Sequence, residues 1–374
     1  MKQTILFFIE SLSGGGAEQV LVTLLRNFNF ERYDVTLLTV SDIGVHRNDI
    51  DYKKVHYRFL IPRKQNAFYS IWYKIKYKLI YRYLPAWLVS RIIIPSGFNT
   101  YIAFTEGYCT KIISKLSPKI NKISYVHIDL QSLPWTLTEK IYKTLDEEKE
   151  AFRRFNKVVC VSHSVERVMQ TYYSLNNTTT IYNPIDVMSI NAMAQQQINF
   201  KVSDGFNLVS VGRLVPQKGY DLLIPIVARL IDDGMNVSLY ILGEGEERPR
   251  LEKQIEDLKL QAAVHLLGYQ KNPYAFLRKM DLFVCSSRAE GFSLVIGEAL
   301  SLGIPVISTN CSGPNELLDG NKYGVLCENH KQIYQRLKEI IPNSDVYTEL
   351  CHKAQMRKNL FDISSSMNQL YDII

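Results

Sequence analysis

The chain has 374 residues, enough for about two to three domains. Hydrophobic residues make up 46% and charged residues 22%, a globular composition that excludes disordered, collagen-like and coiled-coil proteins. Lys and Arg number 44 and Asp and Glu 37, a net charge of +7 that becomes informative only where it is concentrated.

The positive charge lies in the first half. Residues 1–190 carry 25 Lys or Arg and 16 Asp or Glu, a net +9, whereas the remainder carries 19 and 21, a net −2. Residues 52–105 contain ten cations and no acid. Such a one-sided charge indicates an anionic partner, either a membrane or a nucleic acid.

The cysteines and the N-terminus indicate an intracellular protein. The six cysteines form no C-x-x-C or Cys/His cluster, which argues against a zinc or redox motif, and Cys160 and Cys285 lie in apolar runs. Only five apolar residues precede Glu10, too few for a signal peptide, and no uncharged apolar stretch is long enough to span a membrane. We expect reduced thiols in the cytoplasm.

Apolar runs alternate with amphipathic segments through the first half. Strands are predicted at 5–9, 35–40, 100–104, 122–127, 157–161 and 179–182, with a helix at 18–28. This βαβ order predicts a parallel sheet with helices on both faces.

The pattern restarts after Pro184. Strands are predicted at 206–211, 237–242, 264–267, 282–285 and 305–308, and helices at 220–232, 247–259, 273–280, 293–301 and 363–374. The intervening residues 187–204 include three consecutive glutamines and suit a linker or insertion. Two α/β domains in tandem predict a ligand in the cleft between them, at the carboxyl ends of the strands.

The first strand-end loop contains Gly14, Gly15 and Gly16 and precedes the helix at 18–28. Glycines allow a ligand to approach the backbone, and a helix N-terminus offers N–H groups to an anion. The spacing fits the G-x-G-x-x-G dinucleotide motif poorly. A tight turn without a ligand is the alternative.

Two further loops carry charged residues. Arg213 and Lys218 follow the strand at 206–211 and suit a diphosphate, with solvated surface cations as the alternative. Glu290 precedes a helix that carries Glu298 and whose start can bind phosphate through N–H groups. Glu298 lies on a mostly apolar helix, where ribose hydroxyls would be suitable partners. A helix-cap acid and a solvated Glu are the alternative.

Together these loops resemble the retaining, GT-B-fold glycosyltransferases of family 4, of the bacterial surface-polysaccharide type. The Gly-rich loop 14–18, the Arg213 and Lys218 pair and the E-x7-E element from Glu290 to Glu298 match the family's motifs in order. Segments 183–186, 286–292 and 298–307 match as well. The resemblance is close over 208–326 and looser before it.

The resemblance implies two Rossmann-like α/β domains facing across a cleft. Residues 1–187 would form the acceptor-binding domain, 188–204 a linker and 205–357 the donor-binding domain. Residues 358–374 would form a C-terminal helix that returns to the first domain.

The resemblance also implies residue roles. Arg213 and Lys218 would hold the donor diphosphate, Glu290 the sugar and Glu298 the ribose. His127 matches the family's cleft histidine and would bond the donor sugar or position the acceptor hydroxyl, with a structural histidine as the alternative. The other implied donor-binding residues are Gly15, Gly16, Gly243, Tyr269, Gly291, Phe292, Ser293 and Leu294.

The implied chemistry needs no metal. In retaining transfer of this type the acceptor attacks on the face from which the diphosphate departs, so stabilisation of the diphosphate by Arg213, Lys218 and helix N–H groups dominates. The resemblance therefore implies a nucleotide-sugar co-substrate and no cofactor. The D-x-D spelled by Asp49, Ile50 and Asp51, typical of metal sites in another glycosyltransferase fold, is interpreted as a coincidence.

Residues 63–95 form a basic aromatic segment. Phe68, Trp72, Ile75, Leu79 and Tyr83 recur at helical spacing, with lysines and tyrosines around them. This pattern is typical of a helix lying in an anionic membrane interface. A helix packed on the first sheet is the alternative, and nucleic acid is disfavoured because no motif for it accompanies the segment.

The sequence therefore predicts a glycosyltransferase on the inner face of the plasma membrane. It would move a hexose or N-acetylhexosamine from a nucleotide sugar, with UDP preferred on family frequency, to a lipid-linked saccharide in capsule, O-antigen or exopolysaccharide synthesis. The alternatives are a nucleotide-sugar epimerase or a phosphorylase of the same fold, and an inactive sugar-binding subunit.

Overall fold

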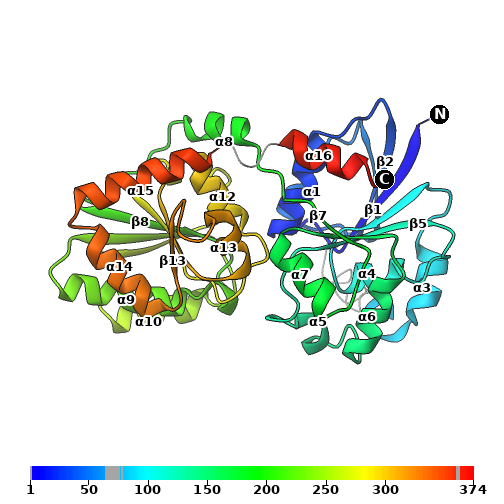
Figure 1. The fold of residues 1–374 in the computed structure, drawn as a ribbon, viewed down its shortest axis with the longest axis horizontal. Coiled ribbons are helices and arrows are strands. Elements are labelled where there is room, and N and C mark those ends of the chain that lie inside the picture. Colours follow the sequence, from blue (N-terminus) through cyan, green and yellow to red (C-terminus); the bar gives the residue numbers. More distant parts are fainter. Residues whose placement is uncertain (1, 64–75, 77–78, 359–362) are drawn as a thin grey trace. The chain divides into compact units, whose positions relative to one another are not determined.

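The chain folds into two compact units in a computed structural model that describes residues 2–63, 76, 79–358 and 363–374. Unit 1 comprises Met1–Pro184 and Ile363–Ile374, and unit 2 comprises Ile185–Asp362. Both are α/β units built on a parallel sheet (Figure 1).

Unit 1 contains a seven-stranded parallel sheet of order β3-β2-β1-β4-β5-β6-β7. The strands are β1 (Gln3–Ile9), β2 (Tyr33–Ser41), β3 (Val55–Ile61), β4 (Thr100–Ala103), β5 (Asn121–Val126), β6 (Lys157–Cys160) and β7 (Thr178–Thr180). The central strands β1 and β4 are mostly buried and mostly apolar because helices cover both faces of the sheet. The strands predicted for the first half are confirmed. The edge strand β3, which exposes His56, Arg58 and Phe59, has no such run and was missed.

The helices of unit 1 divide between the two faces of this sheet. Helix α1 (Gly16–Arg26) shares one face with α16 (Ile363–Tyr371), and the others lie largely on the opposite face (Figure 1). The remaining helical segments are η1 (Val45–Asp49), η2 (Leu79–Tyr83), α3 (Ala86–Ile93), α4 (Tyr108–Ile113), α5 (Trp135–Thr138), α6 (Leu145–Arg153) and α7 (His163–Thr171).

The C-terminal helix α16 belongs to unit 1. The hydroxyl of Tyr371 accepts the backbone N–H of Asn29 at 2.7 Å, and its ring stacks on Tyr33 with centroids 5.2 Å apart. The Ser366 hydroxyl donates to the carbonyl of Tyr182 at 2.8 Å. The predicted return of the C-terminal helix to the first domain is therefore confirmed.

Unit 2 contains a six-stranded parallel sheet of order β10-β9-β8-β11-β12-β13. The strands are β8 (Phe206–Val211), β9 (Val237–Leu242), β10 (Val264–Gly268), β11 (Leu282–Cys285), β12 (Val306–Thr309) and β13 (Val325–Cys327). The strands predicted for the second half are confirmed, and the three-residue edge strand β13 was missed.

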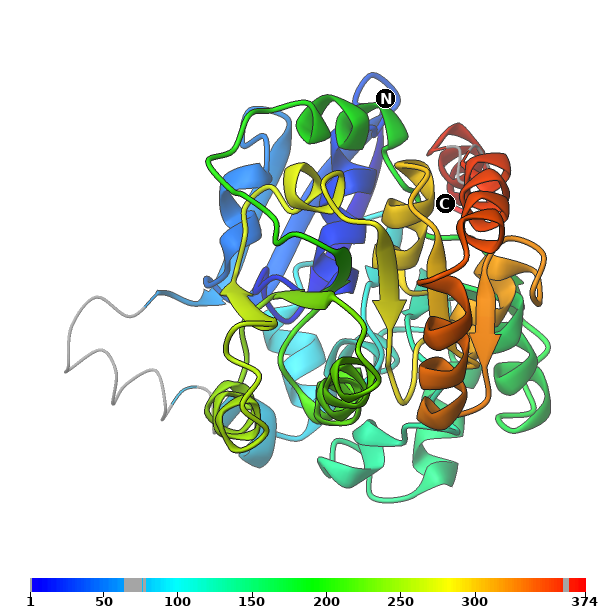
Figure 2. The same cartoon turned by 90° about the vertical axis from the view of Figure 1, so that its left-hand side faces the viewer.

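Helices cover both faces of the unit 2 sheet. Helices α9 (Tyr220–Asp232), α10 (Arg248–Asp257) and α14 (His330–Ile340) lie on one face (Figures 1 and 2). The other helical segments are α8 (Val187–Ala194), η3 (Pro216–Lys218), α11 (Tyr274–Leu277), α12 (Leu294–Ser301), α13 (Ser312–Leu318) and α15 (Ser344–Arg357). The core beneath α9 and α14 is aliphatic and includes Leu223, Val227 and Leu337.

The segment predicted as a linker, 188–204, lies within unit 2, which begins at Ile185 and not after residue 204. Its first residues form α8, which packs on α11 and α12. The side-chain amide of Asn272 donates to the carbonyl of Met193 at 2.8 Å and fixes α8 to the loop before α11. The prediction of a linker is wrong for α8, because its buried Ile190 and Ala194 have an apolar neighbour that local composition does not reveal.

Much of the basic aromatic segment 63–95 lies outside the described residues, including Phe68, Trp72 and Ile75. Its described portion contains η2 and, after Pro85, helix α3. No helix in the described portions of the chain is long and apolar enough to cross a membrane.

Candidate active site

Two neighbouring strands of unit 2, β8 and β11, lead into loops. These loops carry the residues predicted to bind the donor diphosphate and the donor sugar. Arg213 and Lys218 follow β8, and Glu290 follows β11. Because the strands are parallel and paired, their carboxyl ends lie at the same edge of the sheet. The fold thus brings these predicted residues together.

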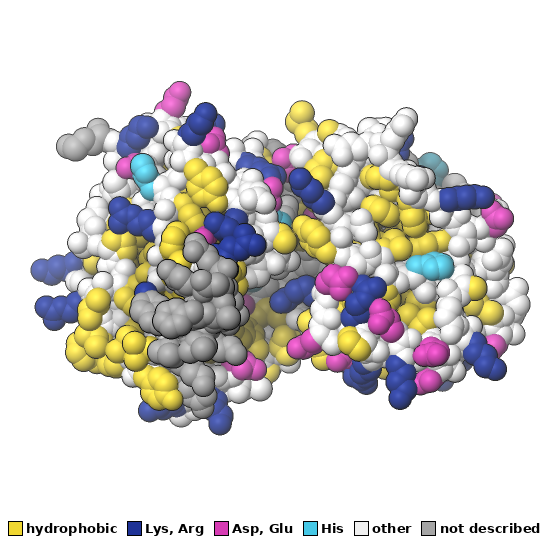
Figure 3. Space-filling model, turned by 180° about the vertical axis from the view of Figure 1, so that it is seen from behind, with side chains coloured by type: hydrophobic (Ala, Val, Ile, Leu, Met, Phe, Trp, Pro, Cys, Tyr) yellow, Lys and Arg dark blue, Asp and Glu magenta, His cyan; other side chains and the backbone are white. Residues whose placement is uncertain are grey.

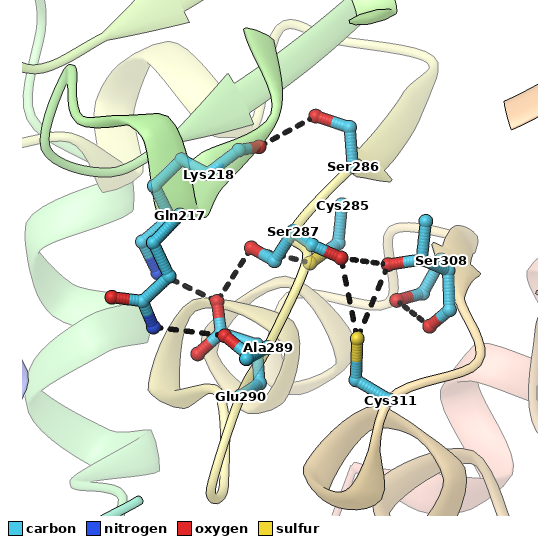
Figure 4. A network of polar contacts seen from close by, with 10 residues as sticks. Gln217, Lys218, Cys285, Ser286, Ser287, Ala289, Glu290, Ser308 and Cys311 are labelled. Atoms are coloured by element: carbon cyan, nitrogen blue, oxygen red, sulfur yellow. Dashed lines mark hydrogen bonds and ion pairs between the residues drawn. The ribbon is translucent and has the colours of Figure 1, made fainter. Parts of the chain in front are cut away.

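The two loops are locked to each other by backbone contacts. Gly219 has φ +68°, and a Cβ atom there would lie 2.1 Å from the carbonyl oxygen of Ser286, so only glycine permits this approach. The Ser286 hydroxyl donates to the carbonyl of Lys218 at 2.8 Å, and the Gln217 amide donates to the carbonyl of Ala289 at 2.8 Å. The charged side chains are therefore presented on a rigid base (Figure 4).

Lys218 and Glu290 form an ion pair in this base. The Lys218 ammonium donates to Glu290 Oε1 at 2.6 Å, and the Ser287 hydroxyl donates to the same oxygen at 2.6 Å (Figure 4). Their side chains are 19% and 8% exposed. Burial lowers the pKa of Lys218, but the charge and hydrogen bond of Glu290 together with the charge of Cys285 raise it by more, so the pKa is raised overall and the ammonium stays charged.

Arg213 is the second cation of the β8 loop. It is exposed, and its charge is close enough to Lys218 to oppose the rise in the pKa of that lysine. Within the described residues it forms no salt bridge, whereas Lys218 is paired with Glu290. The loop therefore offers one guanidinium without a counter-ion beside one paired ammonium.

The start of α12 has features typical of an anion-binding loop. Ser293, its N-cap residue, adopts φ +60°, a left-handed conformation that is strained for a residue with a side chain. Its buried hydroxyl has no hydrogen-bond partner in the described structure. Gly291 and Phe292 precede it, and Leu294 begins the helix. Strain and an unsatisfied polar atom at a helix N-terminus are what a phosphate or sugar ligand would relieve.

Glu298 lies on the same helix and is buried. Its Oε1 accepts the hydroxyl of Tyr274 at 2.9 Å. Burial raises the pKa of Glu298 to about 7, while the Tyr274 hydrogen bond acts in the opposite direction. Glu298 is thus an acid with one neutral partner rather than the solvated residue of the alternative interpretation.

Gly243 and Tyr269, two of the implied donor-binding residues, directly follow β9 and β10. The backbone N–H of Gly243 donates to the carbonyl of Gly268 at 2.9 Å. A Cβ at Gly243 would lie 1.9 Å from the carbonyl oxygen of Gly212, which follows β8. Tyr269 is 54% exposed beside them, so its ring face is accessible to a ligand.

Gly15, Gly16 and His127 belong to unit 1. Gly15 is the N-cap of α1, Gly16 is its first residue, and His127 directly follows β5. His127 Nε2 lies 2.8 Å from the carbonyl oxygen of Phe104, which can only accept, so Nε2 carries the proton. Burial lowers the pKa of His127 to about 4. The neutral ring therefore leaves Nδ1 as a hydrogen-bond acceptor.

Two acids that follow strands of unit 1, Glu106 and Glu10, were missed by the sequence analysis. Glu106 accepts the backbone N–H of His127 on Oε2 at 3.0 Å and is buried. Burial raises the pKa of Glu10 to about 7, an effect opposed by Tyr81 and increased by the charge of Glu106. Glu10 directly follows β1, and Glu106 follows β4 by three residues. The sequence signal that could have identified Glu10 and Glu106 is their position one to three residues after a strand.

Asp49 and Asp51 of the D-x-D sequence form ion pairs with cations of unit 1. Asp49 pairs with Arg26 at 3.0 Å, and Asp51 pairs with Lys54 at 3.7 Å. No group of three or more His, Cys, Asp or Glu side chains placed to hold a metal occurs among the described residues. Cys160 and Cys285 are buried free thiols, as predicted.

Comparison with known proteins identifies the family. The model of glycosyltransferase family 4 matches residues 14–188, and that of glycosyl transferases group 1 matches residues 193–359. The chain is 30% identical, over 96% of both chains, to N-acetylgalactosamine-N,N'-diacetylbacillosaminyl-diphospho-undecaprenol 4-alpha-N-acetylgalactosaminyltransferase of Campylobacter jejuni. It is also 30% identical to an uncharacterised glycosyltransferase of Methanocaldococcus jannaschii, over 56% of this chain and 60% of that protein.

A solved structure shares the fold. HepE of Anabaena, in complex with UDP and glucose, superposes with a TM-score of 0.76 over 98% of each chain at 19% identity. The two parallel-sheet units, the matching family models and the full-length relative lead to one conclusion. The chain belongs to the GT-B-fold glycosyltransferases of group 1.

Proposed function

We propose that the protein transfers a hexose or N-acetylhexosamine from a UDP-sugar, with retention of the anomeric configuration, to a lipid-linked saccharide. The observation that carries the donor part is the Lys218–Glu290 ion pair beside the unpaired Arg213. The two cations would neutralise the departing diphosphate, and the second oxygen of Glu290 would accept a hydrogen bond from a sugar hydroxyl. Preorganised charge of this kind is the largest contribution to many transfer reactions.

The remaining donor contacts follow from the same edge of the unit 2 sheet. The N–H groups at the start of α12, around Ser293 and Leu294, would bind phosphate, and the Ser293 hydroxyl would gain a partner. Tyr269 and Gly243 would border the base, and Glu298 would accept ribose hydroxyls. Gly15 and Gly16 are proposed to contact the donor from the N-terminus of α1. None of these contacts requires a metal ion.

The neutral His127 supports a role at a sugar hydroxyl. Because Nε2 donates to Phe104, Nδ1 can only accept a hydrogen bond, which suits a hydroxyl donor and not a phosphate oxygen. A pKa of about 4 keeps the ring from acting as a cation near neutral pH. His127 would therefore orient a hydroxyl of the donor sugar or the acceptor.

The acceptor class is proposed from the full-length relative. The name of the Campylobacter enzyme specifies a diphospho-undecaprenol acceptor and an alpha linkage. The common UDP-hexoses also carry an alpha linkage to the diphosphate, so an alpha product corresponds to retention. A polysaccharide or glycan assembled on a lipid carrier is the pathway class that this acceptor implies.

The membrane contact is supported by the described part of the basic aromatic segment. On α3, Trp87 is 58% and Ile92 is 71% exposed, with the exposed Arg91 between them. Large apolar side chains gather on this side of unit 1, at the lower left of Figure 3. Exposed apolar residues beside cations are typical of a surface that inserts into an anionic interface.

The donor assignment is tested with the purified protein and a panel of UDP- and GDP-sugars. A UDP-sugar should raise the melting temperature most, since a ligand stabilises the fold in proportion to its affinity. That sugar should then pass to an undecaprenyl-diphosphate saccharide, and NMR should show an alpha linkage. Epimerised sugar released without an acceptor would support the epimerase alternative. Binding without turnover under any condition would support the inactive subunit.

The membrane contact is tested by sedimentation with vesicles. The protein should sediment with vesicles that contain phosphatidylglycerol and less with phosphatidylcholine alone. The double variant Trp87→Ser/Ile92→Ser should lose this difference, whereas the control Met356→Ser, at an exposed methionine of unit 2, should keep it. Equal sedimentation of the double variant and the unmodified protein would contradict the role of α3.

A further inference from the structure

Tyr274 and Glu298 form a buried, hydrogen-bonded pair inside unit 2. Tyr274 begins α11 and is 8% exposed, and Glu298 on α12 is 9% exposed. The hydroxyl of Tyr274 donates to Glu298 Oε1 at 2.9 Å. In the described structure this is the one hydrogen bond that the Glu298 carboxyl makes, and no cation pairs with it.

Such a pair does not serve stability. A buried carboxylate with a single neutral donor lacks the partners that offset its loss of hydration. An apolar side chain of similar size on α12, among Leu300, Ile296 and Ala299, would be more favourable for folding. An incompletely satisfied acid at the edge of a ligand-binding loop indicates a group kept for a ligand.

The pair is also held rigidly. Asn272, two residues before Tyr274, donates to the carbonyl of Met193 on α8 at 2.8 Å, and α11 packs on α8. The bond from Tyr274 fixes one oxygen of Glu298. It leaves Oε2 without a hydrogen bond to any described residue, so this oxygen has a defined direction and unused capacity to accept.

We infer that Tyr274 is a positioning residue that holds Glu298 so that its second oxygen selects nucleotides carrying ribose hydroxyls over deoxynucleotides. The inference rests on the proposed binding of a nucleotide donor by unit 2. A ribose hydroxyl completes the hydrogen bonding of the buried acid, whereas a deoxyribose leaves it unpaired. Sites built to bond a hydroxyl reject analogues that lack it, because the buried polar group then loses its partner.

The inference predicts a change in selectivity and not only in affinity. Without the Tyr274 hydroxyl, Glu298 can rotate and accept water or a ribose hydroxyl in several orientations. Affinity for UDP should therefore fall, while affinity for 2'-deoxy-UDP and 3'-deoxy-UDP, which lack one of the two possible donors, should change less. A tyrosine with a purely structural role would lower the affinity for all three ligands alike.

The experiment is a calorimetric titration of UDP, 2'-deoxy-UDP and 3'-deoxy-UDP into the full chain. The unmodified protein should prefer UDP over at least one deoxy analogue by about tenfold, the effect of a hydrogen bond to a charged group. In Tyr274→Phe this preference should fall to about twofold or less. The control is Tyr347→Phe, which removes a hydroxyl that donates to the carbonyl of Asp281 at 3.1 Å and should keep the preference.

Glu298→Gln provides a second variant if Tyr274→Phe is unstable in thermal unfolding. Glu298→Gln should also lose the preference for UDP. The double variant should lose no more of this preference than either single variant, because the two residues act as a unit. A tenfold preference retained in either single variant would overturn the inference. Equal binding of all three ligands by the unmodified protein would also overturn the inference, but it would leave the proposed function intact. A failure of the unmodified protein to bind UDP would instead contradict the proposed function.

Discussion

Lys218 and Ser287 hold the same oxygen of Glu290, each at 2.6 Å from Oε1. The cation comes from the β8 loop and the hydroxyl from the β11 loop, so the carboxylate is fixed by both sides of the loop junction (Figure 4). The other oxygen, Oε2, has no hydrogen bond within the described residues. This arrangement presents one oxygen for a ligand while the lysine remains charged.

The first prediction concerns Ser287, which is 2% exposed. Ser287→Ala removes a donor to a charged group and should lower donor turnover about tenfold or more, since such hydrogen bonds contribute about 1.5–3 kcal/mol. The measurement is steady-state hydrolysis or transfer of the identified donor. Ser238→Ala, at another buried serine on β9, should stay near the rate of the unmodified protein. Equal rates for both variants would refute the positioning role.

The second prediction is a pH-dependent gain of stability in Glu298→Gln. Burial raises the pKa of Glu298 from 4.5 to about 7, so the folded protein binds this proton more tightly than the unfolded chain. The corresponding stability is fully present below pH 4.5 and is lost as the pH rises through 7. Glutamine does not ionise, so its advantage should grow to about 3 kcal/mol above pH 7.

This gain is measured by chemical unfolding at pH 5 and pH 8. Glu298→Gln should exceed the unmodified protein clearly at pH 8 and little at pH 5. Glu256→Gln, at an exposed position on α10, should show no such difference. A loss of stability at pH 8 would mean that the ionised carboxylate is better satisfied than its single hydrogen bond to Tyr274 indicates.

The third prediction concerns Glu106, which accepts the backbone N–H of His127 at 3.0 Å. Glu106→Met leaves this buried N–H unpaired and should lower the free energy of unfolding by about 1–3 kcal/mol. It should also reduce transfer, because His127 loses its fixed position. Glu106→Gln keeps an oxygen that can accept the N–H of His127. It should therefore retain most of the stability and most of the transfer activity. Similar losses in the two variants, in urea unfolding and transfer assays, would contradict this account of His127.

The fourth prediction concerns metals. Transfer should be undiminished in EDTA, because the proposed charge stabilisation comes from Arg213, Lys218 and the start of α12. Asp49→Ala should break the ion pair with Arg26 and leave transfer unchanged. Strict dependence on Mn²⁺ would contradict the first expectation, and loss of transfer in Asp49→Ala would contradict the second.

The sequence predicts the strand-end loops well, because β1, β8 and β11 are mostly apolar runs followed within three residues by a glycine or a charged residue. For the same reason, Arg213, Lys218 and Glu290 could be assigned from the sequence to loops at the ends of strands. The partners of these residues could not be predicted. Tyr274 lies 24 residues before Glu298, and only the packing of α11 brings its hydroxyl to the acid.

Neighbouring elements decide the burial of two segments, β3 and α8, that the sequence analysis did not identify as a strand and a helix. Strand β3 lies at a sheet edge and exposes most of its side chains, so it shows no apolar run. Helix α8 carries a mixed sequence beside a glutamine tract and is stabilised by α11 and α12. On α3, one cation of the first half, Arg91, lies close in sequence to the exposed apolar side chains of Trp87 and Ile92.

The most direct test of donor binding by Lys218 is a titration of UDP into the unmodified protein, Lys218→Ala and Lys338→Ala. Lys338 is a surface lysine of unit 2 paired with Asp233 at 3.0 Å and controls for loss of one positive charge. Lys218→Ala should fold, bind UDP much more weakly and lose about 10²–10³ in transfer rate. Lys338→Ala should match the unmodified protein in both. Unchanged UDP affinity and transfer in Lys218→Ala would contradict the account.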